Sequence, residues 1–391
     1  MAMAHNVCIH GQKVIGTFST SDEVDYINDD RNRRFYLDRG DEINFDYGKA
    51  FRSYTDRSNR NKNRKSNLVG AKYEWMRDHR QGLIDNGILD TDQSRLNVDF
   101  VSHHGVISCI LKMGGQKDLD LGLAVTLYKG TYHLRSTNPD PDRAQHTQSN
   151  EGTGKKKGAS QQIVASSRLL LKFVTSRDGR NSDETAPQTA PQTAPVNDNE
   201  TFNAMMTVNC GNHPLLVCFE IQAEKRITDP PPDLPNPRNC LNVRSSKWVR
   251  DPVSNEIHPK IGSMKALGWW APNVIAGIPE IYCGLRDDKS TTIKNIKTIK
   301  IDKLVTSKYT KNCWDSGHCI RTLEYVLSKI KELVPDNAED DPNSFKRAVL
   351  TIRSVDGGSG MNTVKIQKRN GKEGDRFVEE DDIQLIFKGN E

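Results

Sequence analysis

The sequence lacks the features that mark secreted and membrane proteins. It contains no apolar run of about 18 residues, the length that a membrane-spanning helix needs. Its first residues, MAMAHNVCIHGQ, include no apolar stretch of the kind found in signal peptides. The eight cysteines form no C-x-x-C pair, and several lie in apolar segments where reduced buried thiols are common. We therefore expect a protein of the cytoplasm, the nucleus or both, which is neither secreted nor bound to a membrane.

Apolar residues are also scarce, and the excess of positive charge is small. Hydrophobic residues make up 35% of the 391, whereas charged residues make up an ordinary 27%. This balance predicts a folded protein with sizeable loops. The net charge of +5 permits a nucleic-acid partner, but a solvated basic surface is the simpler interpretation.

Three segments have the composition of loops. Residues 1–40 mix a short apolar start with Asp, Asn and Arg, which predicts an irregular N-terminal arm. Residues 136–160 contain NPDPD and GKKKG, and residues 176–200 contain TAPQTAPQTAP. Such sequences bury no core, so we predict two flexible loops there.

The remaining sequence alternates between strand and helix patterns, which predicts an α+β fold. Residues 161–175 and 319–334 have helical spacing, and residues 265–274 predict a helix that is broken near Pro272. Residues 97–113 are interpreted as two strands around His103, His104 and Gly105. Further strands are predicted at residues 121–134, 214–223, 240–245, 280–285, 346–353 and 362–368.

The most informative segment comprises residues 208–247 and contains two of these strands. Glu220 and Gln222 share one face of the first strand, because side chains on a strand alternate between faces. Asn242 and Arg244 share one face of the second strand by the same rule. If the two strands are neighbours, the four polar side chains converge.

This segment resembles the core of the DXO decapping exoribonuclease family. The likeness rests on GNHPLL, on E-h-x (h, apolar) and x-h-x-S-S-K, and on MKALGWWAPNVIAGIPEIYCGLR at residues 264–286. It implies a single domain over residues 1–391, with two mixed or antiparallel sheets flanked by helices and a cleft between the sheets. It also implies action on RNA 5′ ends, with four acidic side chains holding divalent metal and a lysine assisting the reaction.

The catalytic positions depart from the family pattern. The four acidic positions and the lysine fall on Val174, Glu220, Gln222, Asn242 and Arg244. A substrate-binding arginine falls on His104, and the glutamine after W-W-A falls on Pro272. Four carboxylates and a lysine carry a charge of about −3 near neutral pH, whereas Glu220 and Arg244 sum to about zero.

These substitutions favour binding over catalysis. Divalent metals prefer several charged oxygen ligands, and Glu220 is the single remaining candidate, so no cofactor is expected unless the site is active with Mg or Mn. The planar guanidinium of arginine can donate two parallel hydrogen bonds to a phosphate. Our hypothesis is that Arg244, with His104 and Lys247, binds a phosphorylated or capped RNA 5′ end and that no DNA is bound.

Other interpretations stay open. The chain could be an active metal-dependent decapping enzyme, an NAD-cap-removing enzyme or a 5′–3′ exonuclease, with ligands drawn from Glu224, Asp229 and Asp233. It could be a scaffold for a protein partner without any role in RNA, or Glu220 and Arg244 could only brace the fold. Trp269 and Trp270 are interpreted as core residues, and His213 as part of a capped turn or as a satisfied core histidine.

Overall fold

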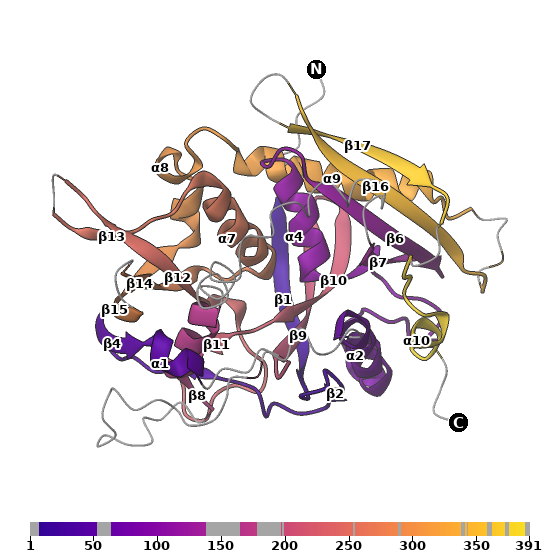
Figure 1. The fold of residues 1–391 in the computed structure, drawn as a ribbon. Coiled ribbons are helices and arrows are strands. Elements are labelled where there is room, and N and C mark those ends of the chain that lie inside the picture. The colour runs from indigo at the N-terminus through magenta and orange to yellow at the C-terminus, as the bar shows by residue number, and fades with distance from the viewer. Residues whose placement is uncertain are drawn as a thin grey trace.

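The computed structural model describes residues 8–52, 64–137, 165–177, 197, 199–252, 255–287, 291–337, 341, 343–357, 362–371 and 375–387. The predicted loops at 136–160 and 176–200 therefore lie almost entirely outside the described residues. Two sheets meet near the middle of the molecule, and helices cover their faces (Figure 1). None of the described helices is long and apolar enough to cross a membrane.

Nine strands form the larger sheet within the described residues. From edge to edge they are β17 (Asn362–Arg369), β16 (Lys346–Asp356), β6 (Asp120–Tyr128), β7 (Thr131–Thr137), β5 (Phe100–His103), β10 (His213–Glu220), β9 (Phe202–Cys210), β1 (Ile9–Thr20) and β2 (Tyr26–Ile27). Strand β5 runs parallel to both β7 and β10, and the other neighbours are antiparallel. We refer to this sheet as sheet A.

The second sheet, sheet B, is also mixed. Its strands follow the order β4 (Glu42–Asp46), β15 (Thr292–Lys300), β14 (Glu280–Arg286), β12 (Cys240–Arg250), β11 (Ala223–Glu224), β3 (Phe35–Tyr36) and β8 (Thr175–Ser176), and β13 (Ile257–Pro259) pairs with β12. The outer part of β12 and strand β13 project away from the body (Figure 1).

Helices fill the space between the sheets and cover their outer faces. The helices are α1 (Tyr47–Arg52), α2 (Arg64–Asp78), α3 (Arg80–Asp85), α4 (His104–Met113), α7 (Ser263–Ala276), α8 (Ser307–Thr310), α9 (Ser316–Leu333) and α10 (Glu380–Gln384), with 3-10 turns at Pro237–Asn239 and Ile301–Val305. Residues 165–173 are also helical and are called helix 165–173.

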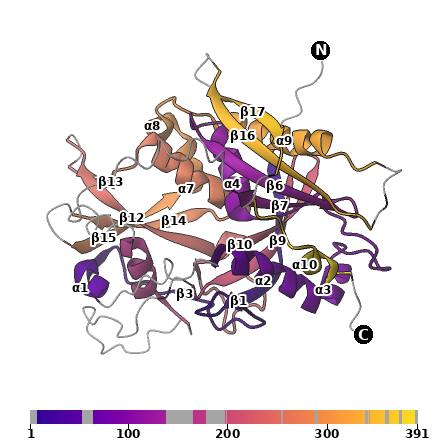
Figure 2. The same ribbon diagram turned by 45° about the vertical axis from the view of Figure 1, so that its right-hand side comes forward.

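One large core joins both sheets through α4, α7 and α9. Phe100 and Leu215 of sheet A and Cys283 of sheet B belong to it. The alternate residues Val101 and Leu216 face the other side of sheet A, where they pack with α2 and α3. Figure 2 shows α2 and α3 on one side of sheet A and α4 on the other. Helix 165–173 packs on the face of sheet B that carries Leu241 and Val243.

Most of the predicted helices and strands are present, because the spacing of apolar residues in the sequence matches the positions that are buried in the structure. Helix α9 buries Cys319, Leu323, Val326 and Ile330 at helical spacing, and Asp315 caps its start by accepting a hydrogen bond from the His318 backbone N–H at 2.6 Å. The α+β class with two mixed sheets and flanking helices is confirmed.

Three predictions of secondary structure were wrong. The second half of segment 97–113 is helix α4, because the His103 side chain accepts a hydrogen bond from the Gly105 backbone N–H and starts a helix. Part of the predicted N-terminal arm is the 12-residue strand β1. Helix α7 continues through Pro272 to Ala276, because burial of most of its side chains offsets the cost of about 3 kcal/mol that an internal proline imposes.

Candidate functional site

The candidate site lies where the chain crosses from sheet A to sheet B. Strand β10 ends at Glu220 in sheet A, and β11 begins at Ala223 in sheet B, so Gln222 lies in the crossing. The predicted strands β10 and β12 belong to different sheets and are not neighbours. Strand β12 pairs with β11 instead, in a register that sets Leu241 opposite Ala223. This pairing still brings Arg244 close to the crossing.

Glu220 forms an ion pair with Arg168. The guanidinium of Arg168 donates from Nη1 to Oε1 at 2.6 Å and from Nη2 to Oε2 at 3.4 Å. The two side chains are 23% and 30% exposed, so this pair is only partly shielded from water. Burial alone would raise the pKa of Glu220, but Arg168, His104 and Arg244 together lower it. Glu220 is therefore a carboxylate at neutral pH, and both its oxygens are engaged.

The position of Arg168 follows from the packing of helix 165–173. Leu169 and Leu170 enter the core on sheet B. The Ser166 and Ser245 hydroxyls lie 2.6 Å apart, and the Ser245 backbone N–H donates to the Ser167 hydroxyl at 3.0 Å. These contacts fix the start of the helix on β12. Arg168 then lies on the face that meets the end of β10.

Arg244 contacts the crossing through Gln222. Its Nη1 donates to Oε1 of Gln222 at 3.2 Å and to the Val243 carbonyl at 3.0 Å, and Gln222 Oε1 also accepts from the Val243 N–H. Burial and the neighbouring charge of Arg168 lower the pKa of Arg244 to about 10. The guanidinium therefore remains positive at neutral pH, and Glu220 is its nearby counter-charge.

His104 completes the cluster from the side of sheet A. The parallel register sets His103 opposite Cys218, so His104, the next residue, packs its ring 4.6 Å from the ring of Phe219. Burial lowers the pKa of His104 to about 4, and the residue is neutral at pH 7. Its buried Nδ1 has no hydrogen-bond partner within the described part of the chain.

Other residues named from the family pattern lie elsewhere. Val174 is 0% exposed and packs in the core with Val243. Asn242 is 2% exposed and donates to the side chain of Asn273 on α7 at 2.7 Å. Lys247 is exposed farther along β12, opposite Arg286 of β14. The structure therefore brings together His104, Glu220, Gln222 and Arg244, but not Val174, Asn242 and Lys247.

Of the acidic residues considered as alternative ligands, Glu224 and Asp229 have carboxylates that are engaged by arginines, and Asp233 is contacted at its backbone carbonyl. Glu224 is buried and holds Arg33 through two hydrogen bonds of 2.8 and 3.0 Å. Asp229 is paired with Arg226 on an exposed loop. The Asp233 carbonyl accepts a hydrogen bond from Arg33.

The interpretations of Trp269, Trp270 and His213 agree with the contacts in the structure. Trp269 and Trp270 are core residues, 8% and 3% exposed. His213 is a satisfied buried histidine at the start of β10, whose Nδ1 lies 3.0 Å from Asp99 Oδ2 and whose Nε2 lies 2.9 Å from the Ser328 hydroxyl.

The cluster does not fit a divalent cation. Within the described ranges, no group of three or more His, Cys, Asp or Glu side chains lies close enough to hold a metal ion. Glu220 supplies the one carboxylate of the cluster described above, and two guanidinium groups stand beside it. Such a donor set lacks the anionic oxygens that Mg²⁺ or Mn²⁺ requires. Two arginines against one carboxylate leave a net positive charge, which suits an anion.

Sequence reasoning missed Arg168. It belongs to a helix more than fifty residues before Glu220, and no local motif joins the two positions. A usable signal was present, since Arg168 and Lys172 are the two cations inside the apolar helical pattern of residues 161–175. A charge at the edge of such a pattern indicates a residue near a partner at the rim of the core.

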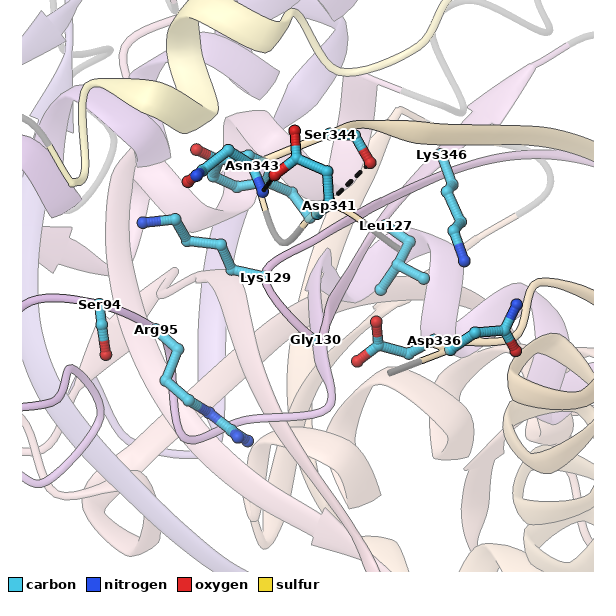
Figure 3. A pocket seen from close by; sticks show the side chains of 12 residues that line it. Ser94, Arg95, Leu127, Lys129, Gly130, Asp336, Asp341, Asn343, Ser344 and Lys346 are labelled. Carbon is cyan, nitrogen blue, oxygen red and sulfur yellow. Dashed lines mark hydrogen bonds between the residues drawn. The ribbon is translucent and has the colours of Figure 1, made fainter. Parts of the chain in front are cut away.

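A separate cavity of about 660 Å³ lies at the turn between β6 and β7 (Figure 3). Arg95, Lys129 and Lys346 line it together with Asp336 and Asp341. It contains none of the residues named from the sequence. A second cavity, of about 610 Å³, is lined by Trp270, Asn273 and neighbouring residues of α7 and α9.

Comparisons with known proteins agree with this fold. Residues 12–381 match the family described as RAI1 like PD-(D/E)XK nuclease. The chain is 26% identical over 336 residues to the decapping and exoribonuclease protein of Xenopus laevis, an alignment that covers 84% of this chain and 76% of the relative.

Two solved structures share the architecture. Rai1 of Scheffersomyces stipitis, in complex with (3′-NADP)⁺ and calcium ion, superposes with a TM-score of 0.68 at 15% identity and 96% coverage of both chains. Rai1 of Candida albicans, in complex with pU5 and Mn²⁺, superposes with a TM-score of 0.64 at 13% identity, covering 92% of this chain and 90% of that one. The chain therefore belongs to the RAI1-like PD-(D/E)XK nuclease family, which includes the DXO decapping proteins.

Proposed function

We propose that this protein binds the phosphorylated or capped 5′ end of RNA at the Arg168–Arg244 site and has little or no hydrolytic activity. The curated relatives are named decapping and exoribonuclease proteins, which supports a role in RNA 5′-end processing. The complex of Candida albicans Rai1 with pU5 supports RNA as the ligand class. The departures of this chain from the family pattern support binding rather than cleavage.

The proposal rests on the hydrogen bonds that Glu220 accepts. Both of its oxygens are engaged by Arg168, whereas a metal site needs carboxylate oxygens directed at the ion. Arg244 is held by an amide oxygen and a backbone carbonyl, both neutral groups. A phosphate that approaches this site can exchange these neutral contacts for charge-assisted hydrogen bonds.

Phosphate oxygens match the geometry of the site. A guanidinium presents several N–H groups in one plane, and two such groups near each other can hold one phosphate or two adjacent phosphates. The buried Nδ1 of His104, which has no partner among the described residues, adds a polar atom beside Phe219, close to the same place. We assign phosphate binding to Arg168 and Arg244, and placement of the terminal nucleotide to His104.

Charge reversal at Arg244 tests the proposal. The Arg244→Glu variant should bind 5′-triphosphate RNA roughly 30-fold more weakly or worse, because loss of a charged contact costs about 2 kcal/mol or more. Fluorescence anisotropy with a labelled oligonucleotide measures this affinity. Arg250→Glu, an exposed position on the projecting part of β12, is the matched control, and Arg244→Gln tests the contact without added repulsion. Equal affinity of Arg244→Glu and the parent would refute the proposal.

The same preparation tests the enzymatic alternative. Capped and triphosphorylated RNA are incubated with the parent protein and Mg²⁺ or Mn²⁺, and products are resolved on a gel. RNA binding without turnover supports the proposal. Metal-dependent product that is lost with chelator would instead identify an active hydrolase with ligands outside the cluster.

A further inference from the structure

A proline-rich loop connects β11 to the 3-10 turn at Pro237–Asn239. Residues 225–236 form neither helix nor strand, and five of the eight residues from Pro230 to Pro237 are proline. Proline fixes its own φ at about −65°, and a residue that precedes proline is restricted to extended or polyproline II conformations. Pro230 and Pro231 meet both conditions, so this part of the loop is extended before any partner binds.

The loop directs apolar surface towards solvent. Five large apolar side chains are exposed among the described residues, and two of them are Ile227, which is 64% exposed, and Leu234, which is 42% exposed. Pro230 and Pro232, which lie between them in the chain, are also exposed. Scattered apolar residues are normal on a surface, whereas a set gathered on one segment indicates an interaction site.

Contacts at the base of the loop hold it in place. Arg33 donates from Nη2 to the Pro232 carbonyl at 2.8 Å and from Nη1 to the Asp233 carbonyl at 3.2 Å. Arg33 is itself only 5% exposed and is fixed by two hydrogen bonds to Glu224. Pro235 is buried and secures the other end of the exposed segment. A loop that is already ordered loses little conformational entropy when a partner binds, which favours recognition.

The backbone of the loop offers hydrogen-bond acceptors. Proline has no N–H, so a run of prolines presents carbonyl groups without matching donors. The Thr228 hydroxyl donates to the Pro230 carbonyl at 2.9 Å, and Arg33 occupies the Pro232 carbonyl. Within the described part of the chain, the carbonyls of Pro231 and Leu234 accept no hydrogen bond. A partner that supplies N–H or O–H donors can use these two groups.

The charges of the loop argue against a nucleic acid as the partner. Segment 226–238 carries two arginines, Arg226 and Arg238, and two aspartates, Asp229 and Asp233, so its formal charges balance. Arg226 and Asp229 form an ion pair with each other. Asp30 lines the same cavity as Pro231 and adds a negative charge beside the loop. A phosphate backbone requires an excess of cations, so recognition here rests on proline and leucine.

We propose that residues 227–234 are a docking site for a protein domain of the WW type. Domains of this type bind polyproline II segments in an aromatic-lined groove, and their Trp N–H and Tyr O–H groups are hydrogen-bond donors. The exposed prolines and Leu234 supply the apolar contacts, and the carbonyls of Pro231 and Leu234 supply the acceptors. SH3 domains bind P-x-x-P segments, but the single P-x-x-P of this loop ends at the buried Pro235. The site is separate from the Arg168–Arg244 site and does not depend on the proposed function.

A double substitution in the exposed segment tests the proposal. The whole chain is titrated into fluorescently labelled, isolated WW domains of the class that binds Pro-Pro-Leu-Pro peptides, and anisotropy measures the affinity. The Pro232→Ala/Leu234→Ala variant should bind roughly tenfold more weakly than the parent, because it loses two of the apolar contacts. A synthetic peptide of residues 227–237 should bind more weakly than the folded chain, because it lacks the contacts from Arg33.

The matched control removes the same kinds of side chain elsewhere. Pro335→Ala/Val249→Ala replaces an exposed proline and an apolar residue that is 40% exposed, and it should bind the WW domains as the parent does. Both double variants should keep the thermal midpoint of the parent, because all four side chains are exposed. Both should also keep its affinity for 5′-triphosphate RNA, so the outcome for the loop is independent of the outcome for the RNA site.

Three results would overturn the proposal. The first is failure of the parent to bind any of the WW domains, although each binds its Pro-Pro-Leu-Pro peptide. The second is undiminished binding by Pro232→Ala/Leu234→Ala, which would place the contact on another surface. The third is binding of isolated SH3 domains in the same assay without binding of WW domains, which would identify a different class of partner.

Discussion

At the scale of single residues, the contacts of Glu220 distinguish an anion-binding site from a metal site. In this structure it neutralises Arg168 and lies near Arg244. Because the fold lowers its pKa, the stability that the ion pair contributes is present above the unfolded-state pKa. That contribution is lost as the pH falls through the lower folded-state pKa.

Removing the charge of Glu220 should have two opposite effects. In Glu220→Gln, Arg168 and Arg244 lose their counter-charge, so affinity for 5′-triphosphate RNA should rise by roughly three- to tenfold. The free energy of unfolding should fall by about 1–2 kcal/mol, because charged hydrogen bonds are lost. Anisotropy and urea denaturation measure the two quantities. Weaker RNA binding by this variant would contradict the role assigned to Glu220, and Glu256→Gln at an exposed position serves as control.

At the scale of elements, the placement of helix 165–173 depends on a glycine of sheet B. A Cβ on Gly284 would lie 2.5 Å from Leu170 Cδ2 and 3.0 Å from Ile293 Cγ2. Strand β14 therefore lets the helix approach closely, and this approach sets Arg168 at the end of β10. The position of Arg168 therefore depends on Gly284.

A larger side chain at this glycine should displace the helix. Gly284→Val should lower the free energy of unfolding by roughly 1–3 kcal/mol, since overpacking a core costs about that amount. It should also weaken RNA binding, because Arg168 moves with the helix. Calorimetry and anisotropy test this expectation, with Gly268→Ala on α7 as control because nothing lies within 4 Å of a Cβ there. Unchanged binding in a destabilised Gly284→Val protein would show that the helix does not position the site.

The elements show how far sequence reasoning extends. Helix α9 and strands β10, β14, β16 and β17 were predictable because their apolar spacing reports their burial. Helix α4 was mistaken for a strand because its run of apolar residues is buried around most of its circumference, which hides the helical period. Strand β1 was missed because its irregular pairing, with two register shifts, disrupts alternation.

The site was only half predictable for a related reason. Glu220, Gln222 and Arg244 do lie close together as predicted, although β10 and β12 belong to different sheets and Gln222 lies in the crossing between them, whereas Asn242 contacts Asn273 instead. The contact arises from the crossing between the sheets, which periodicity does not encode. Arg168 reaches Glu220 in the same way, through long-range packing of helix 165–173. Local patterns predict elements, whereas the meeting of distant elements depends on the tertiary fold.

At the scale of the whole molecule, buried histidines should make stability sensitive to mild acid. Burial lowers the pKa of His104 to about 4 and of His133 to about 3, and it lowers that of His103 well below its usual range. Below a pH of about 6.5 the unfolded chain binds protons at these residues and the folded chain does not. Stability should therefore decline as the pH falls from about 6.5 towards 4.

The size of this effect can be measured directly. Each such histidine should remove about 1.4 kcal/mol of unfolding free energy per pH unit in that range. Urea denaturation at several pH values gives the slope, and His133→Gln should reduce it by one histidine while keeping an acceptor for Tyr73, whose hydroxyl lies 3.0 Å from His133 Nδ1. Equal stability at pH 7.5 and pH 5 would contradict this account.

The order of strands in sheet A also has a consequence for biosynthesis. Strand β1 pairs with β9, which follows it by roughly two hundred residues, and β6 pairs with β16, which lies still nearer the C-terminus. At 5–20 residues per second, a ribosome needs roughly ten to forty seconds to deliver the partner of β1. During that interval the nascent chain exposes Phe18 and its neighbours, which become fully buried later. Productive folding therefore depends on shielding the emerging chain from aggregation until its second half has been made.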